Sequence, residues 1–228
     1  MGVTLKIGHR GAKGHVAENT LASFKKAIVM GAEAVEFDVH ICATGELVVI
    51  HDFTIDRTTN GTGEIHNISL DELKSLAVEG EYTIPTLDEV MELLGPDFIM
   101  NIEMKGRHTA QPLAALLQRY VAEKGYRYEN IIVSSFQYEE LKMMSTLNPD
   151  VHLGVLTQAS VAQAWDWATE FNAKALHPHF SLLTETNVER AREAGFKINT
   201  WTVNEPDDIV RMKMYGVDGI ISDYPERL

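Results

Sequence analysis

The stretch Ala34-Val35-Glu36-Phe37-Asp38-Val39 decides how the rest of the chain is organised. Its β-branched and aromatic side chains alternate with other residues, a period of two that predicts a strand. Side chains alternate between the faces of a strand, so Glu36 and Asp38 project together, roughly 6 to 7 Å apart along the backbone. Two carboxylates this close repel and raise each other's pKa unless a cation compensates. Taken alone, the pair fits a cation site and a solvated strand face equally well.

Composition narrows the kinds of protein that this chain can be. With 228 residues the chain is long enough for one α/β barrel. The single cysteine, Cys42, excludes a disulfide framework, and residues 1–8 lack the pattern of a signal peptide. The sequence shows no apolar run of membrane-spanning length and no myristoylation signal after Gly2. We therefore expect a cytoplasmic protein without a membrane span.

The formal net charge of −13 limits the kinds of molecule that this protein can bind. It argues against nucleic acid, because the 20 lysines and arginines are scattered along the chain. It would also repel an anionic small molecule. A site for such a substrate would need a metal ion and a few local cations to reverse the field.

A second strand follows the first after a tight turn, and the pair predicts where one histidine lies. Residues 43–46 indicate the turn and residues 47–52 the returning strand. So short a connection leaves no room for a helix, so the two strands must be antiparallel. This pairing places His51 near the level of Phe37 and Asp38.

Beyond this hairpin, strands and helices alternate along the chain. Residues 52–84, approximately, lose the period and indicate a small cap insertion, with a short helix from Ser69 or Asp71 to Leu76. Further strands are predicted at 3–8, 98–104, 131–134, 151–155, 174–176, 197–201 and 218–221. Further helices are predicted at 21–30, 85–95, 109–123, 138–146, 160–170, 184–194 and 205–214. Asn19-Thr20 supplies the N-cap of the first of these helices.

Strands and helices in this order predict an α/β protein with a TIM (β/α)8 barrel and a small insertion after the second strand hairpin. We expect a single domain over residues 1–228, with the cap at about 52–84. The site of such a barrel lies on the loops that follow the strands. A doubly wound open sheet is the alternative, but Gly8-His9-Arg10-Gly11 lacks the spacing of a dinucleotide fingerprint.

The stretch Asn101-Ile102-Glu103-Met104-Lys105 repeats the pattern of the organising strand. Glu103 and Lys105 share one face, so charge again projects at the carboxyl end of a strand. With Glu36 and Asp38, Glu103 offers three hard oxygen ligands and no thiolate, a set that suits Mg²⁺, Ca²⁺ or Mn²⁺. A surface ion pair between Glu103 and Lys105 is the alternative.

Two histidines end strands that lead to this site. His9 follows the first strand and His51 ends the returning one. Beside a metal ion they could act as the general acid and general base of a hydrolysis. Arg10 could grip a phosphate with two hydrogen bonds. A purely structural histidine is the alternative for His9.

Two aromatic residues also follow strands. Trp201 and Phe136 could form an apolar wall for an uncharged part of a substrate. Core packing is the alternative for both. Asp223 closes the last strand, where it could simply cap the following turn.

A set of motifs runs in one order along nearly the whole chain. The motifs are His9-Arg10-Gly11, Glu18-Asn19-Thr20, Glu36-Phe37-Asp38-Val39, His51-Asp52, Glu103-Met104-Lys105, Trp201-Thr202-Val203-Asn204 and Asp218-Gly219-Ile220-Ile221-Ser222-Asp223. Together they resemble the glycerophosphodiester phosphodiesterase family, in its short cytosolic bacterial type. The resemblance implies a TIM barrel with a small insertion after the His51 motif. It also implies hydrolysis of a small-molecule glycerophosphodiester, such as glycerophosphocholine or glycerophosphoethanolamine, to sn-glycerol 3-phosphate and an alcohol.

The resemblance also implies roles for individual residues. By motif these are His9 and His51 for the acid/base pair, Glu36, Asp38 and Glu103 for the ligands of one divalent cation, and Arg10 and Lys105 for the phosphate contacts. In this family a glycerol hydroxyl is thought to attack phosphorus first, giving a cyclic phosphate that water opens. The two histidines would exchange roles between the steps. The sequence does not fix which histidine starts as base, the metal, the alcohol, the regulation or the oligomeric state.

Three other functions would keep the barrel. A lysophospholipase D-like phosphodiesterase would act on lipids and would need an exposed apolar loop at the mouth, to which Phe53 could contribute. A phosphodiester-binding module without catalysis would lack a histidine or a metal carboxylate, and the sequence contains them all. A lyase or isomerase would use the Lys105 amine as a base or as a Schiff base.

Overall fold

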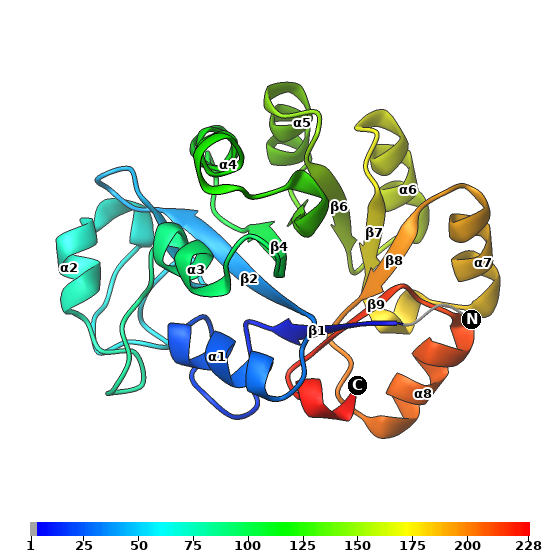
Figure 1. Cartoon of the computed structure of the whole chain (residues 1–228), viewed down its shortest axis with the longest axis horizontal. Coiled ribbons are helices and arrows are strands. Elements are labelled where there is room, and N and C mark those ends of the chain that lie inside the picture. The colour runs from blue at the N-terminus through cyan, green and yellow to red at the C-terminus, as the bar shows by residue number, and fades with distance from the viewer. Residues whose placement is uncertain (1–3) are drawn as a thin grey trace.

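The computed structural model describes residues 4–228, and within these residues eight parallel strands close into a barrel with helices around it (Figure 1). The barrel strands are β1 (Leu5–His9), β2 (Ala34–Ile41), β4 (Ile99–Met104), β5 (Ile131–Ser135), β6 (His152–Thr157), β7 (Ala175–Pro178), β8 (Lys197–Thr200) and β9 (Gly219–Ser222). The surrounding helices are α1 (Leu21–Val29), α3 (Leu87–Leu94), α4 (Ala110–Lys124), α5 (Tyr138–Leu147), α6 (Val161–Glu170), α7 (Glu185–Glu193) and α8 (Pro206–Tyr215). The predicted TIM barrel is confirmed, and the open-sheet alternative is wrong.

β1 closes the barrel because it pairs with both the last strand and the second one. Its Leu5 lies opposite Gly219 of β9, and its His9 lies opposite Glu36 of β2. Both pairings are parallel. The carboxyl ends of the first, second and last strands therefore meet at one edge of the barrel.

β2 shows the predicted alternation between its two faces. Val35, Phe37 and Val39 are buried in the core that the helices share with the barrel, where the Phe37 ring lies 5.4 Å from the Phe24 ring, centroid to centroid. Burying an aromatic side chain of this size stabilises the fold by roughly 1.5–3 kcal/mol. If the pairing of β2 slipped by one residue, Glu36 and Asp38 would turn into the core and the apolar side chains would turn out of it. Burial of the apolar face therefore fixes the register of β2.

The returning strand is antiparallel to β2, as predicted. It is β3 (Leu47–Val49), and Val49 lies opposite Val39. The Ile50 N–H donates to the Asp38 carbonyl oxygen at 3.1 Å. The next residue, His51, therefore lies at the level of Phe37, as predicted. The strand ends before the predicted boundary because Ile50 makes the last of these backbone bonds before the chain turns into the insertion.

Every other predicted boundary falls within two residues of the observed one. The predicted N-cap of α1 is confirmed for Thr20, whose side chain accepts from the Ser23 N–H. The predicted first strand began at Val3, which lies outside the described residues. Trp201 leaves β8 but keeps an isolated bridge to His179.

The insertion between β3 and α3 is drawn in cyan beside the barrel in Figure 1. Its apolar side chains form a small cluster that also includes Ala17, Cys42 and Val48 from outside the insertion. It holds the 3₁₀ helix η1 (Ile65–Asn67) and the helix α2 (Leu70–Ser75), which confirms the predicted short helix. Ser69 and Glu72 form a capping box at the start of α2. That the insertion and the barrel make one domain stays a prediction.

Two findings bear on the cellular setting. Within residues 4–228, no helix is long and apolar enough to cross a membrane. Cys42 is buried as a free thiol and donates to Glu46. The cytoplasmic location stays a prediction.

Candidate active site

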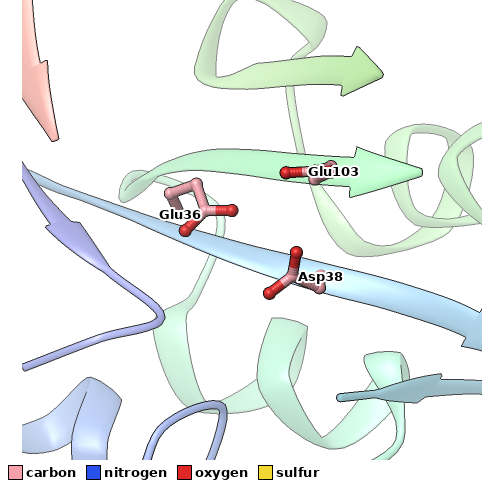
Figure 2. Close-up of side chains that lie close together, drawn as sticks. All are labelled: Glu36, Asp38 and Glu103. Carbon is pink, nitrogen blue, oxygen red and sulfur yellow. The ribbon is translucent and has the colours of Figure 1, made fainter. Parts of the chain in front are cut away.

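A pocket of about 350 Å³ opens at the carboxyl ends of the barrel strands. The residues that line it are His9, Arg10, Glu36, His51, Asn101, Glu103, Lys105, Phe136, Leu156, Gln158, Trp201, Thr202 and Ile221. All the site residues predicted from the sequence are among them except Asp38. That residue is 1% exposed and joins the cluster through its carboxylate (Figure 2).

Three carboxylates meet at the centre of this site (Figure 2). Asp38 lies opposite Glu103 in the parallel pairing of β2 with β4, and Glu36 lies one pleat earlier on β2. Each side chain offers an oxygen within 4.8 Å of the others, and all three are buried. Burial and the charges of Asp38 and Glu103 hold the pKa of Glu36 well above its usual range. Burial, with Asp38, raises the pKa of Glu103 to about 7.

This triad fits a divalent cation. The pKa values of Glu36 and Glu103 are raised although Arg10 and Lys105 lie nearby, so these two cations do not fully compensate the clustered negative charge, whereas a hard divalent cation would. A fourth oxygen points to the same use, since the Asn101 side-chain oxygen is buried without a hydrogen-bond partner among the described residues. Asn101 lies opposite Glu36 across the two strands and also lines the pocket.

Asn19 holds Asp38, the middle carboxylate of the triad, in place, a role that the sequence did not predict. Its side-chain amide donates to the Asp38 carboxylate at 2.9 Å. The backbone of Asn19 is left-handed, with φ +57°, a conformation that asparagine tolerates better than most residues. The Glu18-Asn19-Thr20 motif therefore does two things, because Thr20 caps α1 while Asn19 turns toward the site.

Arg10 faces carboxylates on several sides. Its backbone N–H donates to Glu36 at 3.1 Å, and its Nη1 donates to Glu18 at 2.8 Å. Its Nε lies 3.4 Å from the Asp38 carboxylate, near enough for an ion pair but too poorly aligned for a hydrogen bond. These contacts place a guanidinium at the pocket wall. The two-pronged grip on a phosphate stays a prediction.

His9 is paired with a carboxylate from the far end of the chain. The Nδ1 atom of its ring lies 2.6 Å from an oxygen of Asp223, and Nε2 lies 3.9 Å from Glu36. Asn204 donates to the second oxygen of Asp223 at 2.8 Å. Although burial opposes it, the contacts with His9 and Asn204 lower the pKa of Asp223 to about 2. Asp223 is therefore a partner of the histidine, and its interpretation as a turn cap was wrong.

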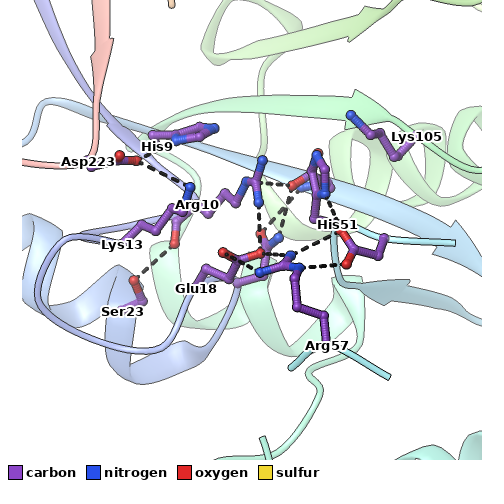
Figure 3. A network of polar contacts seen from close by, with 12 residues as sticks. His9, Arg10, Lys13, Glu18, Ser23, His51, Arg57, Lys105 and Asp223 are labelled. Atoms are coloured by element: carbon purple, nitrogen blue, oxygen red, sulfur yellow. Dashed lines mark hydrogen bonds and ion pairs between the residues drawn. The ribbon is translucent and has the colours of Figure 1, made fainter. Parts of the chain in front are cut away.

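His51 has the same kind of partner, supplied by its neighbour in sequence. Its Nδ1 atom lies 2.6 Å from an oxygen of Asp52, which also accepts from Arg57 of the insertion (Figure 3). Burial lowers the pKa of His51, and burial likewise lowers the pKa of His9. Both rings thus stand at the pocket with one nitrogen held by a carboxylate.

Lys105, Phe136 and Trp201 line one wall together. The Lys105 ammonium donates to Glu103 at 3.0 Å and lies 5.6 Å from the centre of the Phe136 ring. The ion pair between Glu103 and Lys105 is therefore present, but it is partly buried rather than on the surface, since only 20% of the Lys105 side chain is exposed. Although burial opposes it, Glu103 raises the pKa of Lys105, which keeps the amine charged. The Trp201 ring meets the Phe136 ring edge to face at 5.5 Å.

Comparison with known proteins agrees with this geometry. The model of the Glycerophosphoryl diester phosphodiesterase family matches residues 9–227. A relative from Caldanaerobacter subterraneus subsp. tengcongensis, named glycerophosphodiester phosphodiesterase, is 39% identical and the match covers 99% of this chain and 96% of the relative. A solved Oleispira antarctica phosphodiesterase in complex with the product sn-glycerol-3-phosphate is similar with a TM-score of 0.89 and 29% identity, over 99% of this chain and 94% of that one. The solved structure of the Thermotoga maritima glycerophosphodiester phosphodiesterase is similar with a TM-score of 0.81 and 30% identity. The match covers 99% of this chain and 97% of that one.

Proposed function

This chain belongs to the glycerophosphoryl diester phosphodiesterase family, and from that membership we propose that it hydrolyses glycerophosphodiesters to sn-glycerol 3-phosphate and an alcohol. One observation carries the proposal: a single pocket joins two carboxylate-paired histidines to a buried carboxylate triad. The name of the Caldanaerobacter relative and the product bound in the Oleispira structure support the same substrate class.

Glu36, Asp38 and Glu103 are proposed to hold one divalent cation, Mg²⁺, Ca²⁺ or Mn²⁺. When bound, such a cation neutralises the clustered carboxylates and stabilises negative charge that develops on the phosphoryl oxygens. Asn19 and Arg10 contact the Asp38 carboxylate from the side, and these contacts hold it in one orientation.

The two histidines are proposed to move the protons. Asp223 and Asp52 each hold the Nδ1 atom of one ring, which leaves Nε2 for the substrate. Burial lowers the pKa of both rings, which favours the neutral form that a base needs near neutral pH. One ring takes the proton of the attacking hydroxyl while the other protonates the leaving oxygen.

The reaction is proposed to take two steps. First, the oxygen of the glycerol hydroxyl next to the ester bonds to phosphorus, and the bond from phosphorus to the departing alcohol breaks. Water then attacks the cyclic phosphate, and the ring P–O bond breaks to give sn-glycerol 3-phosphate. The two histidines exchange roles between the steps, because the ring that gave up a proton is the one able to take the next.

The remaining predicted residues are proposed to bind the substrate. Arg10 and Lys105 carry the positive charges that the phosphate needs in a protein of net charge −13. Phe136 and Trp201 offer the apolar wall on which the carbon skeleton of glycerol can lie.

A lipid substrate gains no support from the surface around the pocket. Within residues 4–228, none of the exposed large hydrophobic side chains lines it. Most of these side chains lie on the outer helices α1, α5 and α8. Phe53, which is 53% exposed, is the one that follows His51 closely in sequence.

The experiment that tests the proposed function is release of sn-glycerol 3-phosphate from glycerophosphocholine and from glycerophosphoethanolamine. The protein is first treated with a chelator, and Mg²⁺, Ca²⁺ or Mn²⁺ is then added back separately. We expect no release with the chelator and recovery with at least one of the metals. A folded protein that releases nothing with any of them would contradict the proposal.

Lys105→Met should lower kcat about 100-fold, because it removes an ammonium group at the site of the phosphate. The measurement is kcat with saturating metal, together with the melting temperature. Lys74→Met is the matched control, since Lys74 pairs with Glu89 outside the pocket. If the Lys105→Met variant has a lower melting temperature but an unchanged kcat, Lys105 serves only as a structural partner of Glu103.

Trp201→Ala should raise KM by roughly 5- to 30-fold, the equivalent of one or two kcal/mol of lost apolar contact. The matched control is Trp165→Ala, because Trp165 meets Phe196 edge to face outside this pocket. Both variants should lose stability. If KM for glycerophosphodiesters stays unchanged in the Trp201 variant, that residue belongs to the core alone.

A further inference from the structure

We propose that Arg57 of the insertion is a positioning residue for catalysis, which holds Asp52 and through it the ring of His51 (Figure 3). The inference rests on the function proposed above, because it takes His51 as one of the two residues that move protons. It assigns a part in catalysis to a segment that the sequence suggested only as a cap.

The first observation is a two-pronged contact between Arg57 and Asp52. The Nε atom of Arg57 donates to one carboxylate oxygen at 2.6 Å and Nη2 donates to the other at 3.0 Å. The second of these oxygens is the one that lies 2.6 Å from His51 Nδ1. Arg57 thereby fixes the plane of the carboxylate that orients the ring. Arg57 also holds the pKa of Asp52 well below its usual range, so the carboxylate stays charged.

The second observation is that the other edge of Arg57 is anchored to the barrel. Its Nη2 donates to Glu18 at 2.6 Å and its Nη1 donates to the second oxygen at 3.3 Å. Glu18 has only 7% of its side chain exposed and also accepts from Arg10. Although burial opposes it, Arg57 and Arg10 lower the pKa of Glu18 to about 2. Because removing one partner of a buried ion pair is costly, Glu18 holds the guanidinium of Arg57 in a fixed position.

The third observation is how the insertion presents this arginine. The Arg57 side chain is 49% exposed, so packing does little to fix it and its two carboxylate partners must. Its backbone lies in a turn that begins at the buried Ile55, where the Thr59 N–H donates to the Ile55 carbonyl. The Ile55 N–H in turn donates to Gly63. The apolar cluster of the insertion thus holds the base of the turn while the guanidinium reaches to the site.

These contacts need an arginine. A planar guanidinium has two edges and can pair with two carboxylates at once, whereas a lysine ammonium is a single point of charge. Arg57→Gln should therefore release Asp52, and Arg57→Lys should hold it only in part. Arg57 is not among the residues that line the pocket, so neither change alters the pocket wall.

The first test is kinetic. We expect Arg57→Gln to lower kcat on the order of 10- to 100-fold with KM and metal affinity unchanged, and Arg57→Lys to give an intermediate kcat. In an Asp52→Asn background the Arg57→Gln change should cause no further loss, because its only route to the ring is already broken. Arg127→Gln, which removes an exposed pair with Asp97, is the matched control and should keep the kcat of the unmodified protein.

The second test needs no turnover. In protein with ¹⁵N-labelled histidines, the ring nitrogens of His51 are identified as the signals that His51→Ala removes. Arg57→Gln should shift them, because a freed Asp52 no longer fixes the position of the ring proton, whereas Arg127→Gln should not. If the protein releases no glycerol 3-phosphate the proposed function fails, and this measurement still decides the role of Arg57.

Three results would each overturn the inference. They are an unchanged kcat in a folded Arg57→Gln variant, unchanged ring-nitrogen signals of His51, and a further loss of full size in the Asp52→Asn background. The last would mean that Arg57 acts on the fold or on Glu18 rather than through Asp52.

Discussion

His9→Ala and His51→Ala should each lower kcat by about 10²- to 10⁴-fold, the range that a single acid–base residue contributes. Each change removes the ring nitrogen that faces the pocket while the paired Asp223 or Asp52 remains. KM should change far less than kcat, since neither ring carries the positive charge that binds the phosphate.

The controls separate chemistry from folding. His66→Ala should keep the normal kcat, because His66 is exposed and pairs only loosely with Glu64 at 3.5 Å. His9→Gln is a second variant at the more buried position, since its amide can still donate to Asp223 and preserve the fold. Near-normal turnover in any folded variant of His9 or His51 would remove that residue from the mechanism.

Glu36→Gln should weaken binding of the divalent cation by more than about 100-fold, since even outer-shell partners of a metal site are worth 10- to 100-fold. Turnover at ordinary metal concentrations should disappear with it. Titration calorimetry with Mg²⁺, Ca²⁺ and Mn²⁺ measures the affinity directly. Glu193→Gln, an exposed change on α7, is the matched control.

The same substitution should have the opposite effect on the metal-free protein. The pKa of Glu36 is raised by burial and by two neighbouring carboxylates, so the charged side chain is a burden when no cation is bound. Glu36→Gln should therefore raise the melting temperature in chelator, by about 2–4 °C for each kcal/mol of repulsion removed. Added metal, which stabilises the unmodified protein by binding its folded state, should no longer do so. Unchanged calorimetric affinity would contradict the metal-ligand assignment.

The centre of the site could be predicted because it follows from regular geometry. The period of a strand puts Glu36 and Asp38 on one face, and parallel neighbours in register bring Glu103 beside them. The turn after β2 likewise fixed the level of His51. These are properties of single strands and their nearest neighbours, which sequence order determines.

The supporting residues were missed because their contacts depend on closure and on irregular backbone. Asp223 meets His9 only when the last strand pairs with the first, and its position just after β9 was the one available signal. The side chain of Asn19 reaches Asp38 because the backbone of Asn19 is left-handed, and the pattern of apolar residues in the sequence does not predict such a conformation. Arg57 lies in a stretch without any period, so nothing in the sequence pointed it toward Asp52.

The pairing of His9 with Asp223 also sets when the candidate site can be complete. The two residues are 214 positions apart, and a ribosome that adds about 5–20 residues per second needs about 10–40 s to pass from one to the other. During that time the ring of His9 exists without its carboxylate, however well the earlier strands have formed. If His9 acts as proposed, a growing chain lacks one of its two carboxylate-paired histidines until the last strand docks, and full turnover would begin only when the barrel closes.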